Sequence, residues 1–308
     1  MQHYRTPMSY SVVSINRHNR TVKISLFLLL YKRETLNMKL AKKLYKLNSK
    51  QLHLLKLAYK FRYITAPLLT QYKKQKSRKS MYDTLERLVY QNYLDKKLEN
   101  NQTFQNKGTR YYLTAKGIKL LLGDSNLSKQ SLHSMYKNKL ASSAFIDHNI
   151  EVFKTYLHIR DNYPDKFHIF TKSEISPFGW LPETKPDMYI RRITNNLELS
   201  DEYILDLFSD VPAFVIKKRL EAYIEHYDSG EWKDPKSSSD IKHPTILIVC
   251  PDSRIEKQIQ DYANRVLDSM GIDELHIYTT SLRALLSVKE LEPAMWSDIY
   301  KPEKLLSL

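Results

Sequence analysis

Apolar residues between about positions 48 and 92 recur at helical spacing, in three segments separated by short polar turns. The segments are a first helix capped by Asn48 or Ser49, a second helix over 64–72 with Thr65 as a capping hydroxyl, and a third from Ser77 to about 92. Residues 93–98 and 109–113 then alternate between apolar and polar positions, as two strands of a hairpin do. Three helices followed by a hairpin is the element order of a winged helix-turn-helix, in which the hairpin is the wing.

The third predicted helix has an apolar face and a polar face. Its apolar positions follow the i, i+4, i+7, i+8 spacing of one buried stripe, namely Met81, Leu85, Leu88 and Val89. The opposite side carries donors and charged groups, as a recognition helix needs for base edges and phosphates. The residues expected to contact DNA are Lys76, Arg78, Lys79, Ser80, Asp83 and Arg87 from this helix and its turn, and Lys96, Lys97, Lys107 and Arg110 from the wing.

Positive charge is concentrated in the same part of the chain. Residues 39–123 contain 20 Lys and Arg against 4 Asp and Glu, whereas residues 124–308 contain 23 against 29. The formal net charge of +15 therefore comes from the first part of the chain. This asymmetry favours double-stranded DNA as a partner, although a basic helical domain that binds a protein has a similar composition.

Composition narrows the class of protein further. The sequence has 308 residues and is 42% hydrophobic, enough for two packed cores, so we expect two domains. The single cysteine, Cys250, excludes a disulfide framework and a cysteine-based zinc site, and it favours the cytoplasm. The longest apolar run within residues 1–37 spans 24–31, which is too short to cross a bilayer, so no membrane partner is expected. Residues 1–37 are interpreted either as an N-terminal arm or as sequence upstream of a translation start at Met38.

The second half of the chain alternates between helix and strand patterns after a polar linker at 124–131. A long helix from Ser134 to about 162 is expected to bury Leu140, Phe145, Ile150, Phe153 and Leu157. Strands are predicted over 167–170, 187–191, 203–208, 245–250 and 274–278, and helices after Asp210, after Asp252 or Ser253, and over 282–288. This order predicts a mixed sheet flanked by helices, an α/β fold.

The predicted organisation has four parts. They are an arm of uncertain structure (1–37), a winged helix domain (38–123), an α/β domain (132–291) and a C-terminal tail (292–308). A homodimer is left open, because winged helices often dimerise, but no heptad tract indicates a zipper.

Six short motifs occur in an order and at spacings that resemble one protein family. They are YYLTAKGIKLL after the wing, followed by DHNIEVF, KPDMYI, YILDLF, KKRLEAYIEHYDSGEW and TILIVC. The set covers about residues 47–288 and resembles the replication-relaxation family of plasmid and mobile-element proteins. The resemblance implies a winged helix followed by a domain similar to the PD-(D/E)xK nucleases, that is, a restriction-endonuclease-like fold.

Acidic residues in the second half are candidates for phosphodiester cleavage, which needs oxygen ligands for Mg²⁺ and a cation near the scissile phosphate. The candidate metal ligands are Glu151, Asp187 and Asp206. The resemblance places Asp187 and Asp206 at the acidic positions of the nuclease motif. Phe208 stands where that motif has lysine, so Lys217 or Lys218 would have to reach back from the next helix, and Lys218 is the candidate catalytic cation. Alternatively, the two aspartates only make structural hydrogen bonds.

Other chemistries fit the sequence less well. The ten histidines never fall within two residues of one another, which argues against a histidine-cluster relaxase, and no GxxxxGK[ST] loop indicates ATP binding. Two functions remain. One is a DNA-binding accessory or regulator in plasmid or mobile-element replication, relaxation or transfer, with replication or mobilisation proteins as further partners. The other is a Mg²⁺-dependent endonuclease delivered by the winged helix, and Mg²⁺ is expected as a cofactor only in that case.

Overall fold

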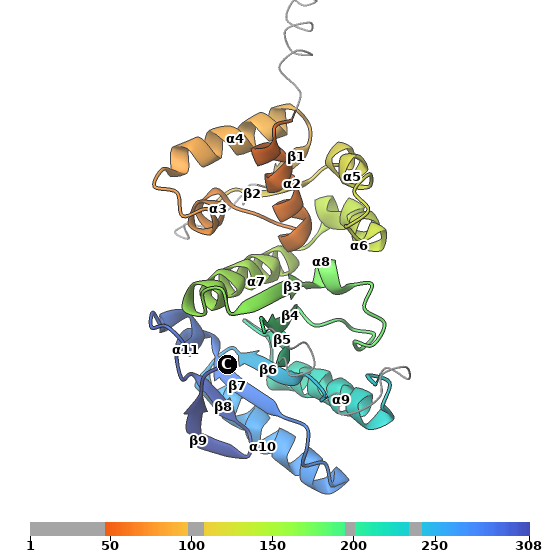
Figure 1. Cartoon of the computed structure of the whole chain (residues 1–308), viewed down its shortest axis with the longest axis vertical. Helices are drawn as coiled ribbons and strands as arrows, with labels where there is room; N and C mark the ends of the chain where they lie inside the picture. The colour runs from red at the N-terminus through yellow and green to blue at the C-terminus, as the bar shows by residue number, and fades with distance from the viewer. Residues whose placement is uncertain (1–46, 98–107, 195–200, 234–241) are drawn as a thin grey trace, which may run out of the picture. The chain divides into compact units, whose positions relative to one another are not determined.

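Three helices and a two-stranded antiparallel sheet form the first described part of the chain (Figure 1). The computed structural model describes residues 47–97, 108–194, 201–233 and 242–308. The first elements are α2 (Ser49–Phe61), α3 (Ala66–Tyr72), α4 (Arg78–Tyr90), β1 (Leu94–Lys97) and β2 (Arg110–Leu113). The predicted order of helices and hairpin strands is therefore present. The turn of the wing and the arm 1–37 lie outside the described residues.

The buried stripe predicted for α4 is confirmed. Met81, Leu85 and Leu88 are buried where α4 packs against α3 and β1. Val89, the fourth predicted position, is only partly buried. The start of α3 is also as expected, because the Thr65 hydroxyl accepts a hydrogen bond from the backbone N–H of Leu68.

A glycine allows the next helix, α5 (Ala115–Leu121), to lie close to the chain that enters β1. A Cβ atom at position 117 would lie 2.3 Å from the backbone carbonyl oxygen of Tyr93, far inside van der Waals contact. The hydroxyl of Thr114 caps α5 by accepting from the Gly117 N–H, and it also donates to the Asn92 carbonyl at 2.6 Å. The sequence TAKG thus holds the end of β2, α5 and the start of β1 together.

The prediction of one long helix from Ser134 to about 162 is wrong in its first part. The structure has α6 (Lys129–Ser134), a 3₁₀ helix η1 (Met135–Leu140) and then α7 (Ser143–Asn162). Ala141 and Ser142 are extended, and the Ser142 hydroxyl caps α7 by accepting from the Phe145 N–H. The break leaves Leu140 87% exposed and Phe145 exposed. Ile150, Phe153 and Leu157 are buried as predicted.

Seven strands form one mixed sheet, in the order in which they occur along the chain. They are β3 (Phe167–Thr171), β4 (Met188–Arg192), β5 (Glu202–Leu207), β6 (Thr245–Cys250), β7 (Ile277–Ser281), β8 (Trp296–Asp298) and β9 (Lys301–Leu306). The pairs β5–β6 and β6–β7 are parallel and all other pairs are antiparallel. β6 lies in the middle and is buried from Ile246 to Cys250, which fits its unbroken apolar sequence.

Helices cover this sheet and connect its strands. They are α8 (Lys172–Ile175), α9 (Ala213–Ser229), α10 (Ser253–Met270) and α11 (Leu282–Ser287). The N-cap of α10 is Asp252, one of the two residues predicted for it. The N-cap of α9 is Pro212 and not Asp210, because the chain stays extended through the proline. The α/β fold class predicted from the sequence is confirmed.

Residues 292–308 complete the sheet, whereas the sequence predicts a C-terminal tail there. β8 pairs with β7 and β9 pairs with β8, both antiparallel. Trp296 is buried, and the backbone N–H of Leu308 donates to the Tyr163 hydroxyl near the end of α7. The last strand predicted earlier in the chain, 274–278, lies instead at Ile277–Ser281.

The helical part and the sheet share one packed interior. The Phe61 ring of α2 stacks on Phe153 of α7 with 3.8 Å between ring centroids. Tyr59 donates to the Ser173 carbonyl at 2.7 Å, and Thr171 donates to the Lys60 carbonyl at 2.7 Å. Residues 49–308 accordingly form one compact unit, so the linker predicted at 124–131 joins segments that pack together. Among the described residues, no helix has the length and hydrophobicity that a bilayer crossing requires.

Candidate nucleic-acid interface and acidic pocket

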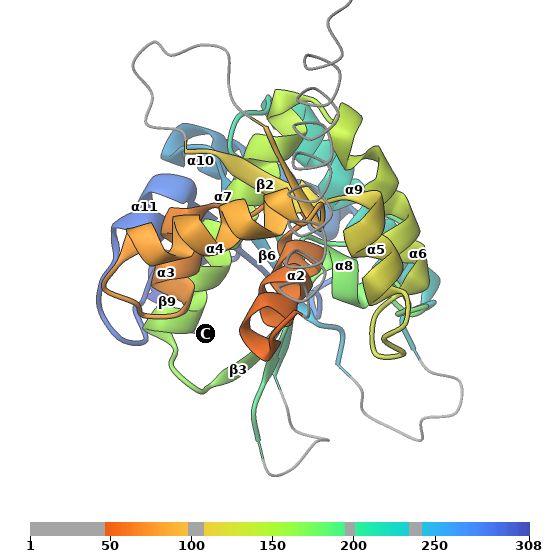
Figure 2. The ribbon, with the colours of Figure 1, turned by 90° about the horizontal axis from the view of Figure 1, so that it is seen from above.

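The solvent-facing side of α4 carries most of the predicted DNA contacts. Its exposed residues, together with the preceding turn, include Lys76, Arg78, Lys79, Ser80, Asp83 and Arg87. Figure 2 looks onto this side, with α4 in front of α3 and α7. Within the described part of the chain, none of the four cations in this set forms an ion pair with a carboxylate. Their charge is therefore directed to solvent and to any anionic partner.

Glu86 ties α4 to both strands of the wing. Its carboxylate accepts a hydrogen bond from the Tyr111 hydroxyl at 2.8 Å and pairs with Lys96 at 2.7 Å. Burial, and then the hydrogen bond to Glu86, raise the pKa of Tyr111, so this hydroxyl remains a donor. The Lys96–Glu86 pair is partly exposed to solvent, so it contributes little to stability.

Two residues predicted to contact phosphates turn inward instead. Arg110 is 5% exposed, and its guanidinium lies 2.6 Å from a carboxylate oxygen of Asp147 on α7. The Lys97 ammonium donates to the Ala141 carbonyl at 2.7 Å. Both side chains therefore hold the base of the wing against the following helices, and Arg110 is removed from the DNA-contact set. Lys107, the remaining predicted wing contact, lies outside the described residues.

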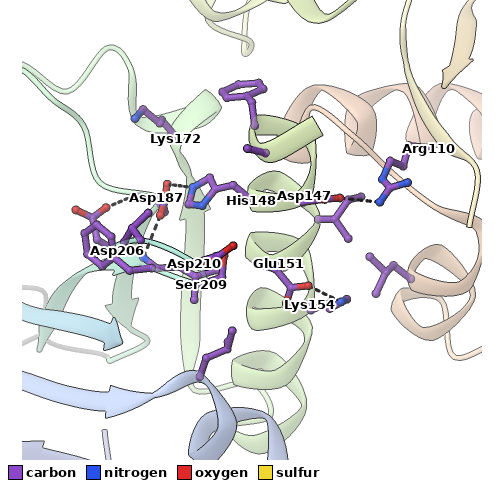
Figure 3. A pocket seen from close by; sticks show the side chains of 18 of the residues that line it. Arg110, Asp147, His148, Glu151, Lys154, Lys172, Asp187, Asp206, Ser209 and Asp210 are labelled. Carbon is purple, nitrogen blue, oxygen red and sulfur yellow. Dashed lines mark hydrogen bonds and ion pairs between the residues drawn. The ribbon is translucent and has the colours of Figure 1, made fainter. Parts of the chain in front are cut away.

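A pocket of about 820 Å³ contains the acidic residues singled out from the sequence. Its walls come from α7, the chain before β4, the end of β5 and the start of α9, with α3 and the base of the wing on a further side. Figure 3 shows Asp187 and Asp206 beside each other on one side of this pocket and Glu151 on α7. The structure thus gathers the two aspartates as predicted, inside a cavity that also borders the helical part.

The two aspartates are nearly buried and directly linked. Asp187 is 9% exposed and Asp206 is 5% exposed. The Asp187 N–H donates to Oδ1 of Asp206 at 2.9 Å, and the Leu207 N–H donates to Oδ2 of Asp187 at 3.0 Å. The remaining oxygen of each carboxylate faces a nitrogen of a basic side chain: Asp187 Oδ1 lies 2.9 Å from Nε2 of His148, and Asp206 Oδ2 pairs with Nε of Arg219.

Arg219 is fixed at several points of its guanidinium group. One terminal nitrogen donates to the Thr184 carbonyl at 2.5 Å, and the other donates to the Tyr223 hydroxyl at 2.9 Å. Tyr223 in turn donates to Asp206 Oδ2 at 2.8 Å. Because Arg219 and Tyr223 are four residues apart on α9, both project from one face of that helix toward the acidic pair.

The charges of the pocket shift the pKa values of its members in consistent directions. Burial would raise the pKa of Asp187, but the hydrogen bond and charge of His148 hold it below its ordinary value. Burial lowers the pKa of His148, but Asp187 and Asp206 together raise it overall. Burial also opposes the charge on Arg219, yet Asp206 raises the pKa of that guanidinium. Asp187 thus favours the protonated form of His148, and His148 in turn favours the ionised form of Asp187.

Helix α7 connects this pocket to the wing through two consecutive residues. Figure 3 shows His148 pointing toward Asp187 and Asp147 pointing away from it toward Arg110. α7 also contacts α2 and α3 on one side and β3 and β5 on the other. The helix is thus covered on more than one face, which a single apolar stripe in the sequence does not indicate.

The lysine predicted to complete the acidic site does not reach it. Lys218 is exposed, and the ammonium of Lys217 lies 4.8 Å from the centroid of the Tyr262 ring. Arg219, the next residue, occupies the place expected for Lys218. The signal that could have identified it is its spacing: Arg219 lies three residues after the buried Ile216 and four before Tyr223, whereas Lys218 falls on the outer side of α9.

The residues of the pocket do not fit a divalent cation. Among the described residues, no three His, Cys, Asp or Glu side chains converge as a metal site would require. Glu151, the third predicted ligand, pairs with Lys154 at 2.5 Å instead of facing the aspartates. Every carboxylate oxygen of Asp187 and Asp206 already accepts a hydrogen bond from the protein. The ligand set predicted for Mg²⁺, Glu151 with the two aspartates, is therefore not assembled.

No family model matches the chain, and no curated protein matches it. Among solved structures, that of restriction endonuclease FokI is similar with 12% sequence identity and a TM-score of 0.28, over 77% of this chain and 43% of that chain. The chain thus matches less than half of that protein's length. A likeness at this level carries no conclusion about activity.

Proposed function

We propose that the protein binds double-stranded DNA through the exposed face of α4 and through the wing. The observation that carries this proposal is the division of α4 into a buried apolar stripe and an outer face with Arg78, Lys79 and Arg87. Lys76 in the preceding turn extends that face. A helix that packs through its apolar face and exposes cations on the opposite face suits the major groove and its flanking phosphates.

In the same proposal, the part of the protein built on the seven-stranded sheet acts as a scaffold for binding and docking and does not cleave DNA. The support is the acidic pocket, in which Asp187 and Asp206 are engaged by His148 and Arg219. Together with the motifs described above, these features favour an accessory or regulator in the replication, relaxation or transfer of a plasmid or mobile element. In this proposal, the chain belongs to the replication-relaxation proteins and acts with replication or mobilisation proteins.

Binding to labelled duplex DNA tests the proposal. Fluorescence anisotropy would compare the wild type with Arg78→Ala/Lys79→Ala. Lys304→Ala is a matched control, because it removes an exposed cation from β9, far along the chain from α4. We expect the double variant to lose roughly 10-fold or more in affinity at moderate salt and the control to bind as the wild type does. Equal affinity of all three proteins would contradict the proposal.

The endonuclease alternative is tested with the same proteins. Supercoiled plasmid would be incubated with the wild type in Mg²⁺ or Mn²⁺, beside Asp187→Asn and Asp206→Asn. We expect the wild type to leave the plasmid intact while it shifts the same DNA in a gel. Nicking by the wild type that both variants lack would show that the acidic pair cleaves DNA.

A further inference from the structure

We propose that His148 and Arg219 take the place of a divalent cation at the carboxylate pair Asp187–Asp206, so that the wild-type pair does not bind metal. The inference concerns the acidic pocket alone and does not depend on DNA binding. Two nearly buried carboxylates, one just before β4 and one in the neighbouring β5, need a compensating positive charge, and either a metal ion or the protein can provide it.

The protein provides that charge from two sides. His148 approaches Asp187 from α7, and Arg219 approaches Asp206 from α9. Between the two side chains, the backbone N–H of Asp187 donates to Asp206, so the carboxylates form one connected pair. A ring nitrogen of His148 and the guanidinium of Arg219 therefore contact the two carboxylates from opposite elements, at oxygens that an added cation would need.

Protein hydrogen bonds also occupy the carboxylate oxygens of Asp187 and Asp206 that would bind a metal ion. A divalent cation such as Mg²⁺ binds through carboxylate oxygens that face a common point and keeps several waters. Here, Asp206 Oδ2 accepts from both Arg219 and Tyr223, and Asp187 Oδ2 accepts from the Leu207 N–H. A metal ion would have to displace the Arg219 guanidinium, which is also held by the Thr184 carbonyl at 2.5 Å.

Thermal unfolding of the full-length chain with and without Mn²⁺ tests the inference. We expect millimolar Mn²⁺ to leave the Tm of the wild type unchanged relative to EDTA. Arg219→Ala leaves Asp206 buried without its cation, so its Tm in EDTA should fall by roughly 10 °C. Mn²⁺ should then restore several degrees, because an ion that binds only the folded state stabilises it. Lys218→Ala, which removes the exposed neighbouring cation, should behave as the wild type does.

Two results would overturn the inference. One is stabilisation of the wild type by Mn²⁺ that Asp187→Asn abolishes, since the pair would then be a metal site despite Arg219. The other is an Arg219→Ala protein that folds but gains nothing from Mn²⁺. If Arg219→Ala does not fold, Arg219→Gln is compared with Asp206→Asn/Arg219→Gln. The double variant should have the higher Tm, because it leaves no uncompensated carboxylate, and an equal or lower Tm would contradict charge compensation.

Discussion

Arg110→Ala is expected to weaken the fold while leaving the ionic part of DNA binding unchanged. The Arg110 side chain is buried and its guanidinium lies 2.6 Å from Asp147 on α7. Breaking a fully buried ion pair costs about 3–5 kcal/mol, because the remaining charge lacks compensation. The Asp147 side chain is 34% exposed, so water recovers part of this loss and we expect about 2 kcal/mol. The apparent Tm should then fall by roughly 4–8 °C.

Two measurements on the same protein distinguish this role from a phosphate contact. Circular dichroism during heating gives the Tm, and anisotropy of labelled duplex at several salt concentrations gives the slope of log K against log[salt]. For Arg110→Ala we expect a lower Tm and the wild-type slope, measured where both proteins are folded. Lys79→Ala, on the exposed face of α4, should show the opposite: the wild-type Tm and a slope smaller by about 1. A wild-type Tm and a reduced slope for Arg110→Ala would refute the structural assignment.

Three further predictions concern the scaffold. Gly117→Ala should destabilise the protein strongly in chemical denaturation, because the added Cβ would meet the Tyr93 carbonyl at 2.3 Å. This clash outweighs the helix propensity of alanine, which exceeds that of glycine by about 1 kcal/mol. A stabilised variant would contradict the close contact between α5 and Tyr93. Leu85→Ala should lower the free energy of unfolding by about 2–5 kcal/mol, and a loss below about 1 kcal/mol would show that α4 is loosely packed. His148 has a raised pKa and Asp187 a lowered one, so the His148 contribution is complete below its unfolded-state value of 6.5 and is lost as the pH rises through its folded-state value. The stability lost in His148→Gln should thus be larger at about pH 5.5 than at about pH 9, and a pH-independent loss would contradict the ion pair.

Local sequence patterns were sufficient to predict the elements that pack through one face. In α4, the spacing of Met81, Leu85 and Leu88 depends only on helix periodicity and on one buried side, and the structure confirms it. The capping hydroxyl of Thr65 acts within the first turn of its own helix, so its role is also local. β6 was predicted with its bounds because both of its faces are covered and its sequence is apolar throughout.

Pairings between distant segments could not be predicted in this way. β8 has three residues and β9 is mostly exposed, so neither has an alternating pattern. β8 is a strand because β7 offers it an edge, and β9 is a strand because β8 does. The charge pairs are also non-local: Asp147 is separated from Arg110 by 37 positions and Asp187 from His148 by 39. A lysine or arginine in the sequence carries the same charge whether it faces solvent or a carboxylate, and only the folded chain distinguishes these cases.

The salt dependence of duplex binding tests the central claim most directly. The variant Lys76→Ala/Arg78→Ala/Lys79→Ala/Arg87→Ala removes the four cations of α4 and its turn that are predicted to contact DNA, while keeping the buried stripe. If each of the four cations neutralises one phosphate, the slope of log K against log[salt] should become less steep by roughly 3–4 units. A variant that folds as the wild type does and retains the wild-type slope would show that DNA, if bound, lies elsewhere on the protein.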